Sequence, residues 1–207
     1  MERRPGMARL LLELEARNAR LTLTDEGADI GGTGFRWGGI TRLQYRAVDH
    51  HVNGAYLRTS FTIGLGDTWR TATFMMFAGT TGPLKTRVDH ATRTAHHDRW
   101  TRAVELIEHH AGTRLATDAV AAVHGGGTVE MSGLRLDNAG IHKVGLFRRT
   151  ISWPQYAGVR REPVYLHLLA TATATAGAKP KSRIQVPNGA WNVAILPRVL
   201  QVLHTLA

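Results

Sequence analysis

The sequence predicts an α+β fold that is mainly β, with two tandem units of antiparallel sheet, each closed by a C-terminal helix. The first observation is an internal repeat, in which one pattern of apolar, turn and aromatic residues occurs in each half of the chain. The second is alternation of apolar and polar residues, which is typical of strands with one buried face. The third is an apolar stripe at helical spacing near the end of each half. The repeated positions are Leu21 and Leu134, Leu23 and Leu136, Asp25 and Asn138, Gly27 and Gly140, Phe35 and Ile151, Trp37 and Trp153, Ile40 and Tyr156, and Leu43 and Val159.

The repeat changes its spacing once. Its first four pairs are 113 residues apart and its last four are 116 apart, which predicts three additional residues in the hairpin of the second copy. The segments 25–27 and 138–140 have turn composition, and each ends in a Gly that tolerates positive φ. Each copy therefore predicts a β-meander that ends in a large aromatic residue.

The first half is expected to hold about seven strands and then a helix. Residues 8–16 fit either a short helix or a strand, and we favour a strand. In the segment 55–64, Leu57, Thr59, Phe61 and Ile63 share one face, and the face with Tyr56 is expected to point outward. Other strands are expected at 20–24, 28–31, 42–46, 71–77 and 84–88, with a turn at 79–83 and a loop at 89–95. A helix is expected at 99–111, capped by Asp98 and ended by Gly112. Its apolar stripe consists of Trp100, Val104, Ile107 and Ala111.

The second half repeats this order. Residues 113–122 are expected to join the halves, and Gly125, Gly126 and Gly127 to form a break before the first strand. Pro197 lies within the closing apolar stripe and is expected to kink that helix or delay its start. Strands are expected at 128–131, 134–136, 141–144, 149–153, 157–161, 164–175 and 183–186. A closing helix capped by Asn188 is expected to follow, and its core-facing residues are Trp191, Ile195, Val199, Val202 and Leu206.

The order of meander, Trp and closing helix resembles the pleckstrin-homology-like (PH-like) fold, a bent sheet or barrel closed by a C-terminal helix. The resemblance covers roughly residues 10–111 and 120–206, and it implies tandem PH-like units at 8–112 and 113–207. It also implies binding of proteins, peptides or lipid headgroups, and only rarely catalysis. Lipid-binding members carry basic residues in their first hairpin loops, where this chain has Lys143, Arg148 and Arg149 in the second copy but only Arg36 in the first.

The net charge of +10 is unevenly distributed. Residues 1–112 hold 15 Lys and Arg against 12 Asp and Glu, whereas residues 113–207 hold 11 against 4. This asymmetry suggests an anionic partner for the second half, with Arg160 and Arg161 as further candidates beside the three loop cations. The alternative is that the charge reflects only the arginine-rich residue usage of a GC-rich genome.

Few residues suggest chemistry. The chain has no Cys, and its histidine doublets at 50–51, 96–97 and 109–110 point to different sides of an element, so neither a metal nor another cofactor is expected. None of Ser60, Ser132, Ser152 and Ser182 lies in a Gly-x-Ser-x-Gly elbow, and no phosphate-binding Gly motif is present. The four residues Trp37, Trp100, Trp153 and Trp191 are expected to be structural core.

These observations favour a non-catalytic binding or scaffold protein that acts through protein–protein contacts and self-associates through exposed sheet edges. The alternative is a protein whose basic second unit binds an anionic surface, either membrane headgroups or nucleic acid. The third hypothesis is a hydrolase with an unrecognised site. The apolar run near the N-terminus is too short for a signal peptide, which predicts a cytoplasmic protein.

Overall fold

The computed structural model describes residues 8–17, 19–79, 90–146, 148–171 and 179–207. The described chain is α+β and mainly β, as predicted, and it separates into two compact units, residues 1–111 and 112–207. Its strands form four antiparallel sheets, each with three or four strands in sequential order. None of these described sheets closes on itself, so the closed barrel that was one form of the prediction is not observed.

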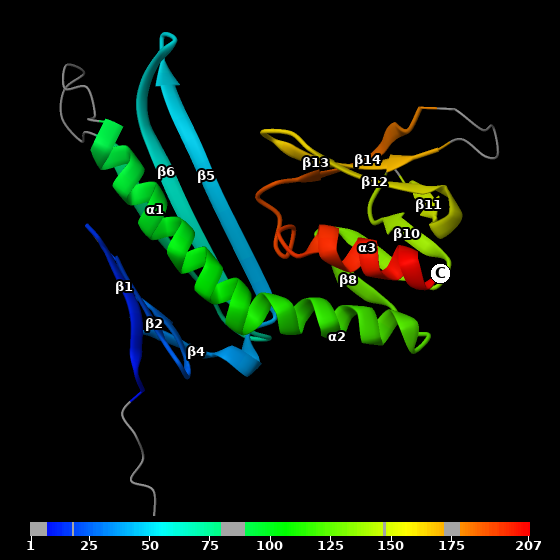
Figure 1. Ribbon diagram of the computed structural model, residues 1–207, viewed down its shortest axis with the longest axis horizontal. Coiled ribbons are helices and arrows are strands. Elements are labelled where there is room, and N and C mark those ends of the chain that lie inside the picture. The colour runs from blue at the N-terminus through cyan, green and yellow to red at the C-terminus, as the bar shows by residue number, and fades with distance from the viewer. Residues whose placement is uncertain (1–7, 18, 80–89, 147, 172–178) are drawn as a thin grey trace, which may run out of the picture. The chain divides into compact units, whose positions relative to one another are not determined.

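The first unit contains two meanders and a long helix (Figure 1). Both meanders contribute to one core, because β7 contacts β1, β2 and β3 while α1 packs against β6 and β7. The first sheet holds β1 (Leu10–Ala16), β2 (Ala19–Thr24), β3 (Gly27–Ile30) and β4 (Thr33–Arg36); the short 3-10 helix η1 (Trp37–Gly39) leads to the second sheet of β5 (Arg42–Val52), β6 (Ala55–Gly66) and β7 (Thr71–Gly79), and α1 (His90–Ile107) follows.

The second unit repeats this order after an additional helix. The closing helix α3 packs against β12, the segment η3 and the additional helix α2. The elements are α2 (Thr113–His124); a sheet of β8 (Val129–Met131), β9 (Leu134–Asp137), β10 (Gly140–Lys143) and β11 (Thr150–Ser152); the 3-10 helix η3 (Trp153–Gln155); a sheet of β12 (Tyr156–Arg161), β13 (Tyr165–Ala170) and β14 (Lys181–Pro187); and α3 (Leu196–Leu206).

The two copies form the same hydrogen bond around their shared tryptophan. The indole Nε1 of Trp37 donates to the carbonyl oxygen of Thr24 at 3.0 Å, and that of Trp153 donates to the carbonyl oxygen of Asp137 at 2.9 Å. Thr24 and Asp137 are 113 residues apart, which is the offset of the repeat. Both indoles are buried, so each bond satisfies a donor that water cannot reach.

A glycine lies at the same place beneath each hairpin. A Cβ atom on Gly27 would lie 2.1 Å from the carbonyl oxygen of Phe35, and one on Gly140 would lie 2.2 Å from that of Ile151. The preceding turn is also shared, since Thr24 Oγ1 accepts bonds from the backbone N–H of Glu26 and Gly27. Asp137 Oδ1 does the same for the N–H groups of residues 139 and 140.

The predicted insertion lies in the hairpin between β10 and β11. In the first unit Ile30 pairs with Thr33, which leaves two residues in the turn. In the second unit the backbone N–H of Lys143 donates to the carbonyl oxygen of Arg149 at 2.8 Å, which leaves the five-residue loop 144–148. The three additional residues are therefore confirmed, and they lengthen only this loop.

The tryptophans of the closing helices differ from those of the hairpins. Trp100 is half-buried on α1, and its Nε1 donates to the carbonyl oxygen of Thr62 at 3.3 Å. Trp191 is also half-buried, but it lies in turns before α3 and not on it. Pro197 occupies the first turn of α3, so the predicted delayed start is confirmed. Ile195 and Val199 are buried as expected, whereas Val202 and Leu206 are exposed, because Leu200 and Leu203 take the inward positions.

The first long helix starts earlier than predicted. α1 begins at His90, so residues 90–95 are helical and Asp98 lies inside the helix instead of capping it. This segment contains neither Gly nor Pro, and nothing in it stops a helix. The predicted turn at 79–83 beyond Gly79, the strand at 84–88 and residues 172–175 of the Ala/Thr run lie outside the described residues.

The join between the halves is also helical. Gly112 does not end a helix, because it has right-handed helical angles within the π-helix η2 (Glu108–Gly112). The following residues 113–122, predicted as a connection, belong to α2, which buries Ala116, Ala119 and Val123 along one face. Asn188 does not cap a helix either, since its Nδ2 donates to the carbonyl oxygen of Glu162 at 2.6 Å.

The strand β6 is buried on both faces near its centre. Phe61 and Ile63 face the core as predicted, but Ser60 and Thr62 on the other face are buried too. Ser60 Oγ lies 2.9 Å from Nε2 of His50, on the neighbouring strand β5. Among the described helices, none combines the length and the apolar character needed to cross a membrane.

We expect Gly27→Ala and Gly140→Ala each to destabilise the protein by about 1–3 kcal/mol or more, because the added Cβ would overlap a backbone carbonyl. Thermal unfolding monitored by circular dichroism measures the loss. Gly38→Ala is the control, since its Cβ would meet nothing within 4 Å. Equal melting temperatures for all three variants would contradict the shared close approach.

The stability of the first unit is expected to fall on acidification. The ring of His110 stacks on Trp37 at 4.9 Å between centroids, and burial, followed by the neighbouring His109, lowers the pKa of His110 below its ordinary value of 6.5. A base with a lowered folded-state pKa favours the folded protein only while it is neutral, so its contribution is complete above pH 6.5 and decreases below it. His110→Phe should flatten the pH dependence of the melting temperature between pH 7 and 5, whereas His51→Phe should leave it unchanged.

Candidate functional site

A row of polar side chains crosses the outer face of the first sheet of the second unit. Glu130 on β8 pairs with Arg135 on β9, Arg135 pairs with His142 on β10, and His142 pairs with Thr150 on β11. Their strand neighbours Met131, Leu134, Leu136, Ile141 and Ile151 are buried. Because side chains alternate along a strand, burial of this apolar set places the polar row on the outer face.

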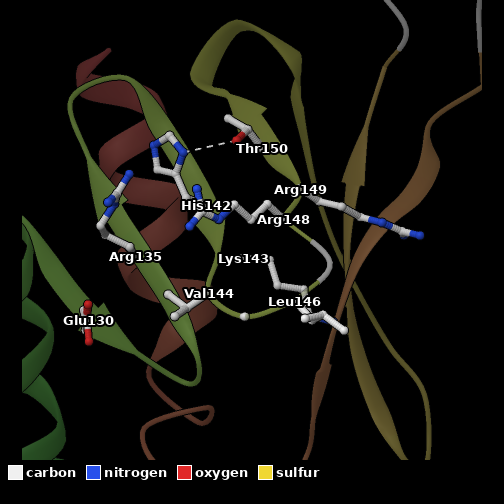
Figure 2. A pocket seen from close by; sticks show the side chains of 10 residues that line it. Glu130, Arg135, His142, Lys143, Val144, Leu146, Arg148, Arg149 and Thr150 are labelled. Carbon is white, nitrogen blue, oxygen red and sulfur yellow. Dashed lines mark hydrogen bonds between the residues drawn. The ribbon is translucent and has the colours of Figure 1, made fainter.

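The loop 144–148 extends this row into a cavity of about 650 Å³. A volume of this size matches the sites that proteins use for small molecules. Four cationic side chains line it against a single carboxylate, that of Glu130, as Figure 2 shows. The lining residues are Glu130, Arg135, His142, Lys143, Val144, Gly145, Leu146, Arg148, Arg149 and Thr150.

The neighbouring strand β14 holds two of the cations. Lys143 Nζ donates to the carbonyl oxygen of Gln185 at 3.5 Å, and Arg149 Nη1 donates to that of Arg183 at 2.8 Å. Neither contact neutralises charge, since both acceptors are carbonyl groups. Arg148 forms no ion pair or hydrogen bond with any residue that the structure describes, so its guanidinium keeps its full capacity for a bidentate anion.

The centre of the row is a hydrogen-bonded histidine. His142 Nδ1 lies 3.2 Å from Thr150 Oγ1, drawn as a dashed line in Figure 2, and Nε2 lies 2.9 Å from Asp137 Oδ1. Burial raises the pKa of Asp137, but the hydrogen bonds from His142 and from the N–H groups of residues 139 and 140 together lower it below its ordinary value. The ionised carboxylate therefore orients the ring beneath the cations.

Three of the five cations proposed from the sequence line this cavity. Lys143, Arg148 and Arg149 all line it, with Arg148 extending toward His142 and Arg149 extending the other way, toward β14 (Figure 2). Arg160 and Arg161 lie on β12 in the other sheet and are not part of the lining.

Other features of the site went unrecognised in the sequence. Arg135 is the fourth cation, and its position between the buried Leu134 and Leu136 was the signal that placed it on the outer face.

Arg160 is paired, with its Nη2 atom 3.0 Å from Glu162 Oε1. Its charge is therefore partly compensated, unlike that of Arg148.

The loop also exposes apolar side chains. Val144 is 53% exposed and Leu146 is 93% exposed, and both line the cavity beside the cations. An exposed leucine gains none of the stabilisation that burial of its side chain would give. The corresponding turn of the first unit has no such side chain, because it consists of Gly31 and Gly32. The additional residues thus combine apolar and basic groups at one point of the surface.

The first unit has a cavity of about 570 Å³ on the corresponding face of its sheet. Thr22, Asp29 and Gly34 line it, at the positions of Arg135, His142 and Thr150. Its charged lining residues are mixed and partly paired, with Arg70 Nη2 2.8 Å from Asp67 Oδ2. The same sheet face is therefore basic in one unit and mixed in the other; the charged residues around the first cavity are Glu26, Asp29, Arg36, Asp67 and Arg70.

No family model, curated protein or solved structure matches this chain. Within the residues that the structure describes, no three His, Asp or Glu side chains are arranged to hold a metal ion. The chemistry that the cavity presents is that of cation donors for an anionic group such as a phosphate or a carboxylate.

Proposed function

We propose that the chain is a binding protein made of two PH-like units and that its second unit attaches to an anionic membrane surface. The PH-like assignment is supported by the order of a four-stranded meander, a three-stranded meander and a closing helix, which occurs twice. Membrane attachment is supported by one observation above all. The exposed Leu146 and four cations line the same cavity.

A membrane fits this combination better than a nucleic acid does. Cations near an anionic bilayer contribute on the order of 1 kcal/mol each, and an apolar side chain gains by entering the boundary between headgroups and acyl chains. Leu146 would have no comparable place along a phosphate backbone, since it is neither aromatic nor a hydrogen-bond donor. The described cations suffice for weak, salt-sensitive attachment, and the leucine adds a component that salt does not screen.

We expect wild-type protein to sediment with vesicles containing about 30% phosphatidylserine, and less so as salt increases. Removing two cations in Lys143→Ala/Arg148→Ala should weaken binding by about 30-fold, as two increments of about 1 kcal/mol imply. The matched control is Arg160→Ala/Arg161→Ala, which removes the same charge from the other sheet. This control should bind nearly as the wild type does.

The apolar component has its own pair of variants. Leu146→Asp should weaken binding even at low salt, whereas Val164→Asp, at another exposed apolar position of the same unit, should have a much smaller effect. Equal losses for both basic double variants would refute the site. Binding to duplex DNA that persists in Leu146→Asp, without vesicle binding by wild type, would support the nucleic-acid alternative.

Protein binding by the first unit is the second candidate function. Trp69 is 90% exposed on the turn between β6 and β7, and Asp67 holds that turn by accepting bonds from the N–H groups of Trp69 and Arg70. The side chain of Arg70 and these N–H groups lower the pKa of Asp67 to about 2, so the carboxylate is ionised at neutral pH. A rigidly presented tryptophan is typical of interface hot spots.

We expect Trp69→Ala to keep the wild-type melting temperature, because the side chain contributes little to the folded core. The same variant should lose proteins that wild type retains from a lysate of its own cells, compared by quantitative mass spectrometry. Val52→Ala, at another exposed position of the first unit, is the control. Identical protein sets for wild type and Trp69→Ala would remove the support for this candidate.

A further inference from the structure

Three side chains meet on the outer face of the second sheet of the second unit. Ser182 on β14 places its Oγ 2.8 Å from Nδ1 of His167 on β13. On the other side of the ring, His167 Nε2 lies 3.0 Å from Oε2 of Glu162, in the turn after β12. The order of hydroxyl, imidazole and carboxylate is that of a serine nucleophile with its base and orienting acid.

The histidine is buried although it lies on the outer face. His167 is 5% exposed, whereas Ser182 at one of its nitrogens is solvent-exposed. With the ring proton on Nε2, the nitrogen nearer the carboxylate, Nδ1 presents its lone pair to the serine hydroxyl. The carboxylate thus favours the tautomer that can accept the serine proton.

The carboxylate belongs to a well-anchored turn. The backbone N–H of Glu162 donates to the carbonyl oxygen of Tyr165 at 2.9 Å, and Asn188 Nδ2 donates to the Glu162 carbonyl. The contact from His167 Nε2 to Oε2 is short, but its direction is outside the range of a hydrogen bond, so the interaction is electrostatic. Catalytic contacts of this kind are commonly misaligned before substrate binds.

The strand around Ser182 is irregular. Leu168 pairs with Ile184 and Leu169 pairs with Ser182, so Arg183 is an additional residue at a β-bulge. Bulges re-aim side chains and occur often beside active sites. Arg149 Nη1 donates to the carbonyl oxygen of Arg183, which brings a guanidinium to the residue next to Ser182. A positive charge there can stabilise an oxyanion that forms at the serine.

We propose that Ser182 is an acyl-accepting nucleophile, with His167 as general base and Glu162 as its positioning residue, acting on small carboxylic esters. Ser182 Oγ bonds to the acyl carbon while its proton passes to His167 Nδ1. The ester C–O bond then breaks, and the alcohol leaves with that proton. Water, activated by the same histidine, releases the carboxylic acid and restores Ser182. This activity goes beyond the proposed binding function and does not depend on it.

A second serine provides an internal comparison. Ser60 Oγ also lies close to a histidine, 2.9 Å from His50 Nε2. Its side chain is buried, however, and the described contacts of His50 include no carboxylate. Ser60 therefore has a base but neither access to an acyl group nor an orienting acid, and it should not react.

The test is labelling of the full chain with an alkyl fluorophosphonate, followed by intact mass measurement and peptide mapping. Ser182 Oγ would displace fluoride from phosphorus, giving one adduct per chain on Ser182 and none in Ser182→Ala. Ser60→Ala should label as the wild type does. His167→Asn should label at least 100-fold more slowly, the usual contribution of a general base.

Glu162→Gln tests whether Glu162 positions His167 or only stabilises the fold. Because the substitution is exposed, it should leave the melting temperature unchanged while it slows labelling. It should also change the pH profile of labelling. Labelling that is absent from wild type, spread over several serines, or as fast in Glu162→Gln or in Ser182→Ala as in wild type would overturn the proposal. These outcomes do not require the buried His167 variant to fold.

Discussion

The hydrogen bond from a buried indole to the carbonyl at the end of the preceding hairpin is the interaction on which both units depend. It fixes Trp37 over Thr24 and Trp153 over Asp137, and so sets where the first sheet ends and the second begins. In the same hairpin the backbone passes very close to a strand position, and only glycine fits there. The Gly and the Trp of each copy therefore act on the same hairpin.

The two units share their inward residues and differ in their outward ones. Strand alternation permits this, since one face of the sheet builds the core while the other is free to change. The cross-strand row that is Glu13, Thr22, Asp29 and Gly34 in the first unit becomes Glu130, Arg135, His142 and Thr150 in the second. Insertion of three residues beside that row then adds the apolar tip. Both changes leave the core pattern intact.

The membrane-binding proposal and the nucleophile proposal both concern outer faces of the second unit, yet they rest on different residues. The cavity uses the first sheet and the inserted loop, whereas Ser182, His167 and Glu162 belong to the second sheet and its turn. Arg149 is the only residue assigned to both, through its hydrogen bond to Arg183. In the first unit, Gly64 takes the position that His167 has in the second, so the nucleophile arrangement is specific to one copy.

The sequence by itself determined the repeat, the mainly-β class, most strand positions and the inserted loop, because periodicity and turn residues act over a few neighbouring positions. It also indicated that Lys143, Arg148 and Arg149 lie near one another, since they fall within seven consecutive residues. Only the tertiary structure decided that Arg135 joins them and that Ser182 meets His167, because strand register pairs residues far apart in sequence. The helical residues after Gly112 were likewise decided by packing, which overrides the local stop signal of that glycine.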